Sequence, residues 1–223
     1  MIRIFIFSYS GDAAEAVACV RCARMAVPCA SVTVVDDASS PVQEETAEAL
    51  RSMGAEYVQS SWERHGNLRG PDCIRGMLSE MCREAEDDDI LVKVDCDTAL
   101  LDGGWLRWME QRPWCQMYTS GDFVNGDWRV FGCLYALRGW IARRLYREMD
   151  WTLLDDRAPE DWTIGREVLA RVPAALCRID EPWRKRSPWS IWTAWCWPSR
   201  TVSAESYAAR FAVVITGSPR MSN

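Results

Sequence analysis

A chain of 223 residues is long enough for one α/β domain with a full hydrophobic core. Hydrophobic residues make up 48 % of it, which excludes a disordered chain, and a net charge of −6 excludes the global positive field typical of nucleic-acid binding. The sequence has no run of about 18 apolar residues, so it predicts no transmembrane segment. Its opening stretch, MIRIFIFSYS, is too short and too strand-like for a signal peptide.

Ten cysteines are scattered through apolar periodic segments, which indicates reduced, buried thiols and a cytoplasmic protein. Cys19 and Cys22 form a C-x-x-C pair whose helical spacing places both on one face. No second C-x-x-C follows, so we interpret them as core residues in preference to a zinc or redox pair.

The first half of the chain alternates between short apolar runs and amphipathic stretches. Apolar runs rich in β-branched residues predict strands, and the periodicity between them predicts helices. The predicted strands are 2–7, 31–35, 55–59 and 90–94, and the predicted helices are 12–27, 40–54 and 71–86. This order predicts a single Rossmann-like α/β domain with a mostly parallel central sheet flanked by helices.

The predicted helix over 40–54 has clear boundary signals. Ser40 has the side chain of an N-cap, Pro41 suits the first helical position, and Gln43 completes a capping box. Gly54 is the expected C-cap. The sequence therefore predicts a helix start at Ser40 and Pro41.

Polar residues follow the predicted strands at their carboxyl ends, where parallel sheets bind ligands. In ILVKVDCDTALL (90–101), an apolar strand leads straight into Asp95 and Asp97. Residues two apart at a strand end point the same way, so these carboxylates repel each other unless a divalent cation lies between them. A solvated turn with one capping aspartate explains the pattern equally well.

A second acidic pair lies in the second half of the chain. VFGCLYALRGWIARRL (130–145) predicts a strand followed by a helix, and APEDWTIGREVLARV (158–172) predicts a further helix. Glu160 and Asp161 fall in the first turn of that helix, where acidic side chains favour the helix dipole. Capping accounts for one of these acids more economically than for both.

The order of these pieces resembles the GT-A glycosyltransferases of the large family-two type, over roughly residues 2–180. FSYS resembles the end of the family's first strand, and VTVVDDASS resembles the second strand, whose acid contacts the nucleotide. HGNLRGPDCIRGML resembles the Asn/Gly segment under the nucleotide, and VKVDCDTAL resembles the D-x-D strand that holds metal and diphosphate. GCLYALR resembles the glycine-containing strand beside the donor sugar, and PEDWTIG resembles the helix start that carries the catalytic base.

The resemblance implies a GT-A fold and transfer of a sugar from a nucleotide-sugar to an acceptor hydroxyl. Asp97 would bind Mn²⁺ or Mg²⁺ directly, and Asp95 directly or through water and ribose. Asp161 would be the catalytic base beside Glu160, and a base opposite the leaving group implies inversion. Trp162 is the expected acceptor platform. The residues expected at the donor are Ser8, Tyr9, Asp36, Asp37, Asn67, Arg69, Asp95 and Gly132.

One feature departs from the family pattern. Many GT-A enzymes supply a further metal ligand, often His, downstream of the base, whereas the single histidine here is His65, upstream of the D-x-D. The third ligand would be water, a C-terminal residue or none, which leaves open a non-catalytic nucleotide-sugar-binding protein of the same fold. A nucleotidyltransferase is the other alternative, but SYSGDAAEA after the first strand offers one Gly and no Lys or Arg for phosphates.

Residues 181–223 form a Trp-rich extension, which we expect to pack on the 1–180 domain. The segment 182–200 combines Trp with basic residues and has no acid, and its prolines disfavour an amphipathic membrane helix. We favour an acceptor-side loop, with peripheral membrane contact or core packing as alternatives. The expected partners are a UDP- or GDP-sugar donor and a saccharide or lipid-linked acceptor. Other tryptophans expected on the same wall are Trp105, Trp108, Trp128 and Trp162.

Overall fold

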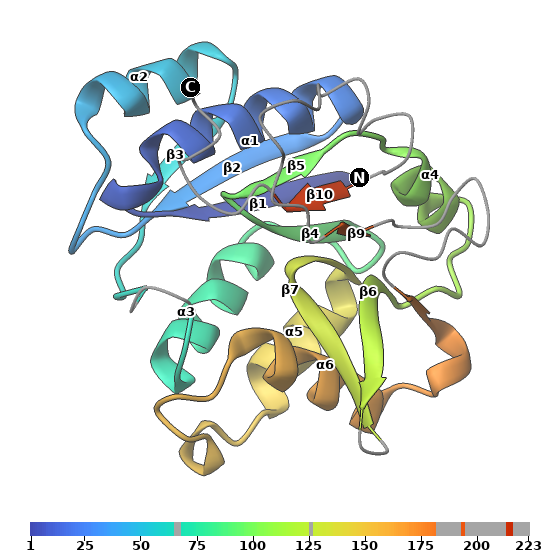
Figure 1. Ribbon diagram of the computed structural model, residues 1–223. Coiled ribbons are helices and arrows are strands. Elements are labelled where there is room, and N and C mark those ends of the chain that lie inside the picture. The colour runs from blue at the N-terminus through green and yellow to red at the C-terminus, as the bar shows by residue number, and fades with distance from the viewer. Residues whose placement is uncertain (65–67, 125–126, 182–192, 195–212, 216–223) are drawn as a thin grey trace.

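The computed structural model describes residues 1–64, 68–124, 127–181, 193–194 and 213–215 (Figure 1). Its centre is a seven-stranded sheet with the order β3-β2-β1-β4-β7-β6-β8. The first four strands in this order are parallel, β7 is antiparallel to β4 and β6, and β8 is parallel to β6. The strands are β1 (Ile2–Ser8), β2 (Ser31–Asp36), β3 (Glu56–Gln59), β4 (Ile90–Asp95), β6 (Met117–Val124), β7 (Asp127–Arg138) and β8 (Cys177–Asp180). The predicted α/β class and mostly parallel sheet are confirmed.

Helices cover both faces of this sheet (Figure 1). Residues of α1, α2 and α4 contribute to the core on one face, and residues of α3, α5 and α6 to the core on the other. The helices are α1 (Ala13–Ala26), α2 (Glu44–Ser52), α3 (Pro71–Cys82), α4 (Gly104–Glu110), α5 (Gly139–Glu148) and α6 (Glu160–Arg171). Short 3-10 turns are η1 (Ser10–Asp12), η2 (Trp151–Leu153) and η3 (Ala174–Leu176).

The central strands are apolar because both of their faces are buried. In β1, Ile4 and Ile6 belong to the core under α1, whereas Phe5 and Phe7 belong to the core under α3. Successive side chains of a strand point to opposite faces, so a strand covered on both sides reads as an unbroken apolar run. This is the pattern that made the strands of the first half readable.

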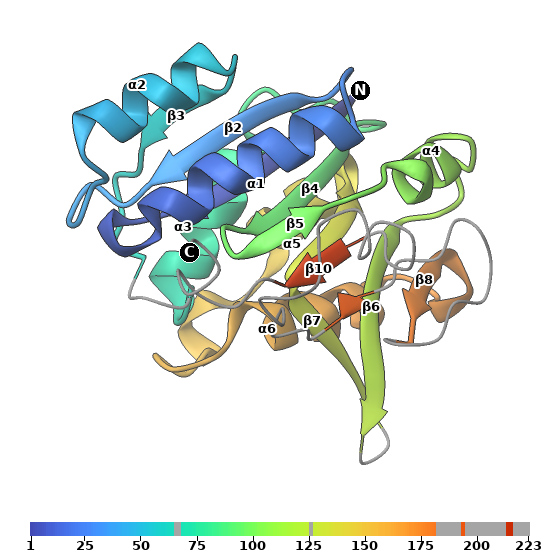
Figure 2. The ribbon, with the colours of Figure 1, turned by 45° about the horizontal axis from the view of Figure 1, so that its top comes forward.

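A second, small sheet has the order β5-β10-β9 (Figure 2), and its strand β5 contacts α1. Its strands are β5 (Thr98–Leu100), β9 (Thr193–Ala194) and β10 (Val213–Ile215), and β10 is antiparallel to β5. Two short pieces of the C-terminal region are therefore paired, directly or through β10, with the strand that follows the D-x-D. The division at residue 180 stays a prediction.

Two predicted helix boundaries are wrong. The helix expected from Ser40 begins as α2 at Glu44, and its N-cap residue Gln43 makes no side-chain capping bond. The Ser40 hydroxyl lies 2.7 Å from that of Ser10, so it ties two loops together and caps no helix. The helix expected to reach 86 ends as α3 at Cys82, and Glu84 adopts a positive φ of 100°.

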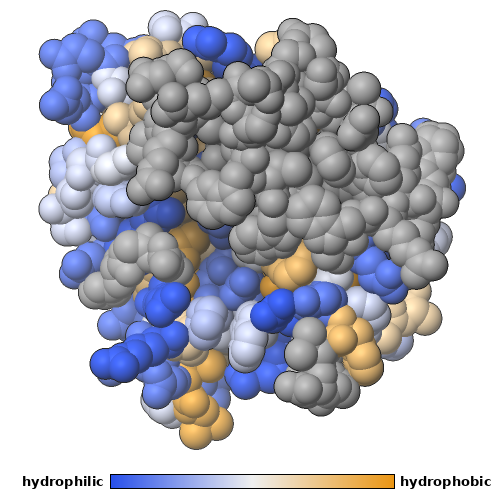
Figure 3. Space-filling view, viewed as in Figure 1, coloured by the Kyte–Doolittle hydropathy of each residue, from blue (hydrophilic) through white to orange (hydrophobic). Residues whose placement is uncertain are grey.

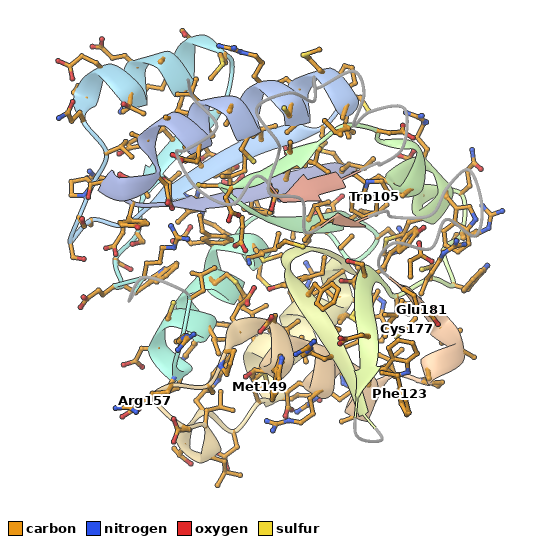
Figure 4. All side chains as sticks on the ribbon, viewed as in Figure 1. Trp105, Phe123, Met149, Arg157, Cys177 and Glu181 are labelled. Carbon is orange, nitrogen blue, oxygen red and sulfur yellow. The ribbon has the colours of Figure 1, made fainter. Side chains whose placement is uncertain are left out.

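The described surface is mostly hydrophilic, with small hydrophobic patches at the lower edge of the view in Figure 3. Three large apolar side chains are exposed on the side of β6, β7 and α6: Leu153 by 80 %, Phe123 by 61 % and Trp162 by 54 %. Phe123 lies toward the far end of the β6–β7 hairpin (Figure 4). Within the described part of the chain, none of the helices has the length and apolar character of a membrane span.

Candidate active site

The D-x-D lies at the turn between β4 and β5. Val92 and Val94 pack in the core under α1, so the alternate positions Lys93 and Asp95 face the side of α3 and α6. Cys96 points the other way, and its thiol donates a hydrogen bond to the Phe7 carbonyl oxygen at 3.1 Å. The chain thus turns Asp95 toward the same side as α6, and Asp97 lines the same cavity as Asp95.

Residues of four segments line one cavity of about 370 Å³, which we call the acidic cavity. It brings together six of the residues predicted from the sequence: Arg69, Asp95, Asp97, Gly132, Glu160 and Asp161. Its other lining residues are Arg64, Leu68, Lys93 and Cys133. Four carboxylates therefore face three cationic side chains across the cavity, which gives it a net negative lining when all are ionised.

Lys93 is a site residue that the sequence reasoning missed. Its side chain is only 1 % exposed, and its Nζ lies 2.6 Å from Asp95 Oδ1 and 2.7 Å from Glu160 Oε1. It also donates to the Gly132 carbonyl oxygen. The available signal was a lysine inside an otherwise apolar strand, because a lysine is almost never fully buried without a partner.

The start of α6 is held against the cavity by the loop that precedes α3. The Gly70 N–H donates to the Ala158 carbonyl at 3.0 Å, and the Glu160 N–H donates to the Leu68 carbonyl at 3.2 Å. Gly70 has φ +82°, and a Cβ there would lie 2.7 Å from the Asp156 carbonyl oxygen, so only glycine allows this approach.

The two acids at this helix start have different partners. Glu160 is directed to Lys93, whereas Asp161 accepts hydrogen bonds from Gly132 N at 3.2 Å and from Trp162 N at 2.8 Å. Asp161 therefore binds a backbone N–H of its own helix, and Glu160 does not cap the helix with its side chain. The N-cap residue of α6 is Pro159 and makes no side-chain capping bond, so capping accounts for the contacts of neither acid.

Burial raises the pKa of three carboxyls in the acidic cavity. Glu160 is fully buried, which raises its pKa to about 7 although Lys93 opposes the shift. Burial and then the charge of Asp95 raise the pKa of Asp97 to about 6. Burial also raises the pKa of Asp161 above its ordinary value. Such shifts are typical of acids and bases at functional sites.

Two buried thiols, those of Cys19 and Cys96, lie at the D-x-D turn on the face of the sheet covered by α1. The Cys19 thiol on α1 lies 3.6 Å from the Asp95 carbonyl oxygen, and burial raises the pKa of Cys19 and Cys96 well above the ordinary value. Cys22 is half-buried and, like Cys19, a free thiol. Among the described residues, no group of three or more His, Cys, Asp or Glu side chains is arranged to hold a metal ion.

The ends of β1 and β2 are tied together by a buried carboxylate. Asp36 accepts hydrogen bonds from the Ser8 hydroxyl at 2.7 Å, from Val42 N at 2.9 Å and from the Tyr57 hydroxyl at 2.6 Å. Ser8 and Asp36 are both 0 % exposed. The expectation that they contact a nucleotide therefore gives way to a structural role, because their polar atoms bind each other and the protein.

Asp37 and Tyr9 lie nearer to the cavity, beside Arg64. Asp37 accepts hydrogen bonds from Ser39 N at 2.9 Å and from Arg64 N at 3.0 Å. Burial works against it, but these bonds hold the pKa of Asp37 below its ordinary value. The Arg64 guanidinium forms an ion pair with Asp12 and lies 5.0 Å from the Tyr9 ring centroid. Sequence reasoning missed both Arg64 and Asp12.

A second cavity, of about 500 Å³, lies on the other side of the first turn of α6. It is lined by Trp162, Trp128 and Arg129 among others, and we call it the Trp162 cavity. Trp105 and Trp108 do not belong to this wall. They are 1 % and 8 % exposed and pack against Tyr118 with centroid distances of 5.5 and 5.4 Å, so their predicted role is wrong (Figure 4 shows Trp105 beside α4).

Some of the predicted site residues lie outside the described residues. These are Asn67, with the neighbouring His65, and all of the Trp-rich segment 182–200 except the backbone of 193–194. Their expected roles stay predictions.

No protein-family model matches the sequence, and no curated protein sequence matches it significantly. Solved structures of glycosyltransferases do match. Mouse xyloside xylosyltransferase 1 in its apo form is 9 % identical with a TM-score of 0.56, and the match covers 99 % of each chain. An active-site mutant of LgtC, a galactosyltransferase, is 13 % identical with a TM-score of 0.55 over 98 % of this chain and 88 % of its own.

A third match is glucosyl-3-phosphoglycerate synthase from Mycobacterium tuberculosis, in complex with Mn²⁺, UDP and glucosyl-3-phosphoglycerate. It is 12 % identical with a TM-score of 0.54, over 81 % of this chain and 69 % of its own. At such low identity the likeness concerns the fold. The chain has the fold of the GT-A glycosyltransferases, which confirms the fold that the resemblance implied.

Proposed function

We propose that the protein transfers a sugar from a nucleoside-diphosphate sugar to an acceptor hydroxyl. The observation that carries this proposal is the convergence of two acidic pairs on one cavity: Asp95 and Asp97 from the end of β4, and Glu160 and Asp161 from the start of α6. Asp95 and Asp97 suit a metal ion bound to the diphosphate of the donor. Glu160 and Asp161 suit proton transfer from the acceptor hydroxyl. The glycosyltransferases of the same fold support this assignment.

Asp97 and Asp95 are the residues that would hold Mn²⁺ or Mg²⁺. Their oxygen donors are the kind that these ions prefer, and one or two carboxylates suffice when substrate phosphates complete the shell. The raised pKa of Asp97 reflects burial beside a like charge, which a cation would compensate. When bound, the ion would supply positive charge opposite the diphosphate leaving group.

The diphosphate and nucleoside would lie on the side of Arg64 and Tyr9. Arg64 lines the acidic cavity, and its buried Nε has no hydrogen-bond partner within the described part of the chain. A guanidinium with a free donor suits a phosphate oxygen. Arg69 is exposed at the rim of the same cavity and would contribute a second positive charge. Tyr9 would stack on the base or ribose, and Asp37 would order this end of the site.

Asp161 would accept the proton of the acceptor hydroxyl. The N–H groups of Gly132 and Trp162 fix its carboxylate at the cavity wall, and burial raises its pKa toward the range of a useful base. A base on the face opposite the leaving group gives a single displacement with inversion at the anomeric carbon. Glu160 is directed to Lys93, so it would position the first turn of α6 while Asp161 takes the proton.

The acceptor would lie in the Trp162 cavity. The indole of Trp162 is 54 % exposed and follows the proposed base directly, and Trp128 lines the same cavity. Aromatic faces of this kind suit the apolar face of a sugar ring, while Leu153 and Leu154 on the same wall suit an apolar group attached to it. We therefore propose a saccharide acceptor, free or lipid-linked. The described cysteines are all free thiols, which fits a reducing, cytoplasmic setting.

The test is nucleotide binding followed by turnover. UDP-, GDP- and CDP-sugars are screened by thermal shift with and without Mn²⁺, and the best donor is then titrated by calorimetry. We expect one donor to stabilise the protein more strongly with Mn²⁺ and to be consumed in the presence of saccharide acceptors. Absence of binding by every nucleotide, with or without metal, would remove the proposal.

A second candidate function is nucleotide-sugar binding without catalysis. It is favoured by one observation: in the chain as described, the D-x-D is not joined by a third acidic, histidine or cysteine ligand. Saturable donor binding without hydrolysis or transfer to any acceptor would select this alternative. The nucleotidyltransferase alternative is disfavoured, because η1 after β1 carries Asp12 and no basic residue.

A further inference from the structure

Lys93 makes contacts that the proposed reaction does not use. It is one of two lysines among 26 basic residues, and it occupies a position that is 1 % exposed. Placing an ammonium group there costs free energy unless charged or polar partners compensate it. A chain that otherwise uses arginine almost exclusively has a compact ammonium at this position, which indicates a requirement for its geometry.

The three acceptors around Lys93 come from three different elements. Asp95 Oδ1 on β4 lies 2.6 Å from Nζ, Glu160 Oε1 on α6 lies 2.7 Å away, and the third acceptor is the Gly132 carbonyl oxygen on β7. An ammonium group has three N–H donors. Lys93 uses two of them in hydrogen bonds to Asp95 and Gly132, and its charge pairs with Glu160, so it binds one group on each element.

These acceptors belong to the two sides of the acidic cavity. Asp95 lies on the donor side, next to Asp97. Glu160 is the first residue of α6, and Gly132 donates its N–H to the Asp161 carboxylate at 3.2 Å. Lys93 thus contacts Asp95 on the donor side directly. It also contacts Glu160, the neighbour of the proposed base Asp161 in the chain, and Gly132, whose N–H binds the Asp161 carboxylate.

We propose that Lys93 is a positioning residue that ties Asp95 to the turn carrying Glu160 and Asp161, and so fixes the donor side and the base relative to each other. The inference rests on the proposed function for its catalytic consequence. Its structural half, energetic coupling of Asp95 to Glu160 through Lys93, is independent of any activity.

The alternative is that Lys93 only balances charge in a buried site. The two roles differ in what the double variant Lys93→Met/Glu160→Gln does. It removes one positive and one negative charge together, so it relieves the buried, uncompensated carboxylate that Lys93→Met alone creates. It does not restore the tie between β4 and α6. A positioning role therefore predicts that stability recovers while the rate does not.

The experiment measures melting temperature, metal-dependent UDP affinity and single-turnover transfer rate at saturating donor. The variants are Lys93→Met, Lys93→Arg and the double variant. Arg138→Met is the matched control, because Arg138 is also a buried cation, 5 % exposed, and donates to the carbonyls of Cys115, Met109 and others away from the cavity. The control is expected to lose stability and keep the transfer rate of its folded fraction.

We expect the double variant and Lys93→Arg to fold and to transfer sugar at least about tenfold more slowly than wild type, because small misplacements of reacting groups carry large rate costs. Lys93→Met is expected to melt lowest. Recovery of both melting temperature and rate in the double variant would reduce Lys93 to charge balance and overturn the proposal. A wild-type rate in Lys93→Met would overturn it as well.

Failure of the proposed function is recognised separately. If the wild-type protein transfers no sugar, the coupling is read from unfolding equilibria of Asp95→Asn, Glu160→Gln and their combination. With Lys93 present, the two changes are expected to be non-additive by at least about fivefold in the unfolding constant, and to become additive when Lys93→Met is added. Additivity with Lys93 in place would overturn the inference whatever the activity.

Discussion

Asp36 and Glu160 are both buried carboxylates at the ligand-facing edge of the sheet, yet their surroundings differ in kind. Three donors from the protein bind Asp36, and all of them are neutral. Glu160 faces one buried cation, and burial, followed by the charges of Asp95 and Asp161, raises its pKa. The end of β2 therefore uses a carboxylate to fix loops, whereas the start of α6 concentrates charges that oppose one another.

The difference divides this edge of the sheet into two regions. We call the ends of β1 and β2 the framework region, because their carboxylates fix loops, and the end of β4 with the start of α6 the chemical region. At the β1 and β2 ends, hydrogen bonds from Ser39 and Arg64 lower the pKa of Asp37 although burial opposes them. At the β4 and α6 ends, burial raises the pKa of Asp97 and Glu160 to about 6 and about 7. Substitutions in the first region should change stability, and substitutions in the second should change binding or rate.

The largest expected effect is that of Asp161→Asn. This change keeps the size of the side chain and an oxygen acceptor for Gly132 N, but it removes the proton acceptor. Loss of a general base lowers rates by about 10²–10⁴-fold. We expect a loss of this order in single-turnover transfer, with unchanged donor affinity. The amide has one oxygen for the two N–H donors of Gly132 and Trp162, so a stability loss of about 1 kcal/mol is expected as well.

Glu160→Gln is the companion of this variant. A wild-type rate for Asp161→Asn would move the role of the base to Glu160. Wild-type rates for both variants would show that the start of α6 takes no part in the reaction. The start of α6 would then have no role in catalysis that sets it apart from the ends of β1 and β2.

The next effect concerns the framework region. In Asp36→Asn, an amide replaces a carboxylate that accepts three hydrogen bonds, so at least one of the donors Ser8, Val42 and Tyr57 loses its acceptor. Leaving a buried polar group unpaired costs about 1–3 kcal/mol. We expect a loss of this size in the free energy of unfolding, measured by urea denaturation, with an unchanged transfer rate in the folded protein.

Tyr57→Phe is the matched control for that measurement. It removes one of the three donors and leaves the carboxylate satisfied by the other two, so a loss of about 1 kcal/mol is expected. If Asp36→Asn instead abolished nucleotide binding while its stability stayed at the wild-type level, Asp36 would contact the donor as the sequence first predicted.

Asp97→Asn should weaken metal-dependent nucleotide binding by at least about tenfold, on the order of 1.4 kcal/mol. Asp95→Asn should have the same effect or a smaller one, because Asp95 Oδ1 already binds Lys93. Calorimetric titration of Mn²⁺ and UDP gives the comparison, and titration without metal is the control. Wild-type affinity in both variants would make the D-x-D a turn without a ligand role.

Much of the fold was readable because the central strands are buried on both faces. Apolar runs marked β1, β2 and β4, and the acidic pairs of the site stood where strands and helices end. The boundary at Ser40 failed for a physical reason. Its hydroxyl bonds to Ser10 across 30 residues of sequence, and a capping motif gives no information on such a competing tertiary partner.

The site was less readable than the fold, because it depends on contacts between distant segments. Lys93 looked like one polar residue in an apolar strand, and its meaning appears only when Glu160 is brought beside it from α6. Arg64 and Asp12 likewise meet across a separation of 52 residues. Ser8 and Asp36 stood at the predicted positions, but the sequence did not show that their polar atoms bind each other.

The smallest expected effect is a difference in the sign of two pH dependences. The folded state raises the pKa of Glu160 from 4.5 to about 7, so the folded protein binds a proton that the unfolded chain has released. The contribution of the Glu160 carboxyl to the free energy of unfolding therefore falls as pH rises from 4.5 to about 7. Glu160→Gln removes this dependence, so the stability of the variant relative to wild type should rise as pH rises from 4.5 to about 7. Asp37 behaves in the opposite way, because the folded state lowers its pKa below 3.8 and the stability it contributes is lost as pH falls through that range. The difference in free energy of unfolding between wild type and Asp37→Asn should therefore be largest at neutral pH and should vanish in acid.

Urea denaturation of wild type, Glu160→Gln and Asp37→Asn across this pH range measures how both differences in free energy of unfolding change with pH. Slopes of the same sign would mean that the two ends of the sheet edge hold their carboxylates in the same way, and the division into framework and chemistry would be wrong.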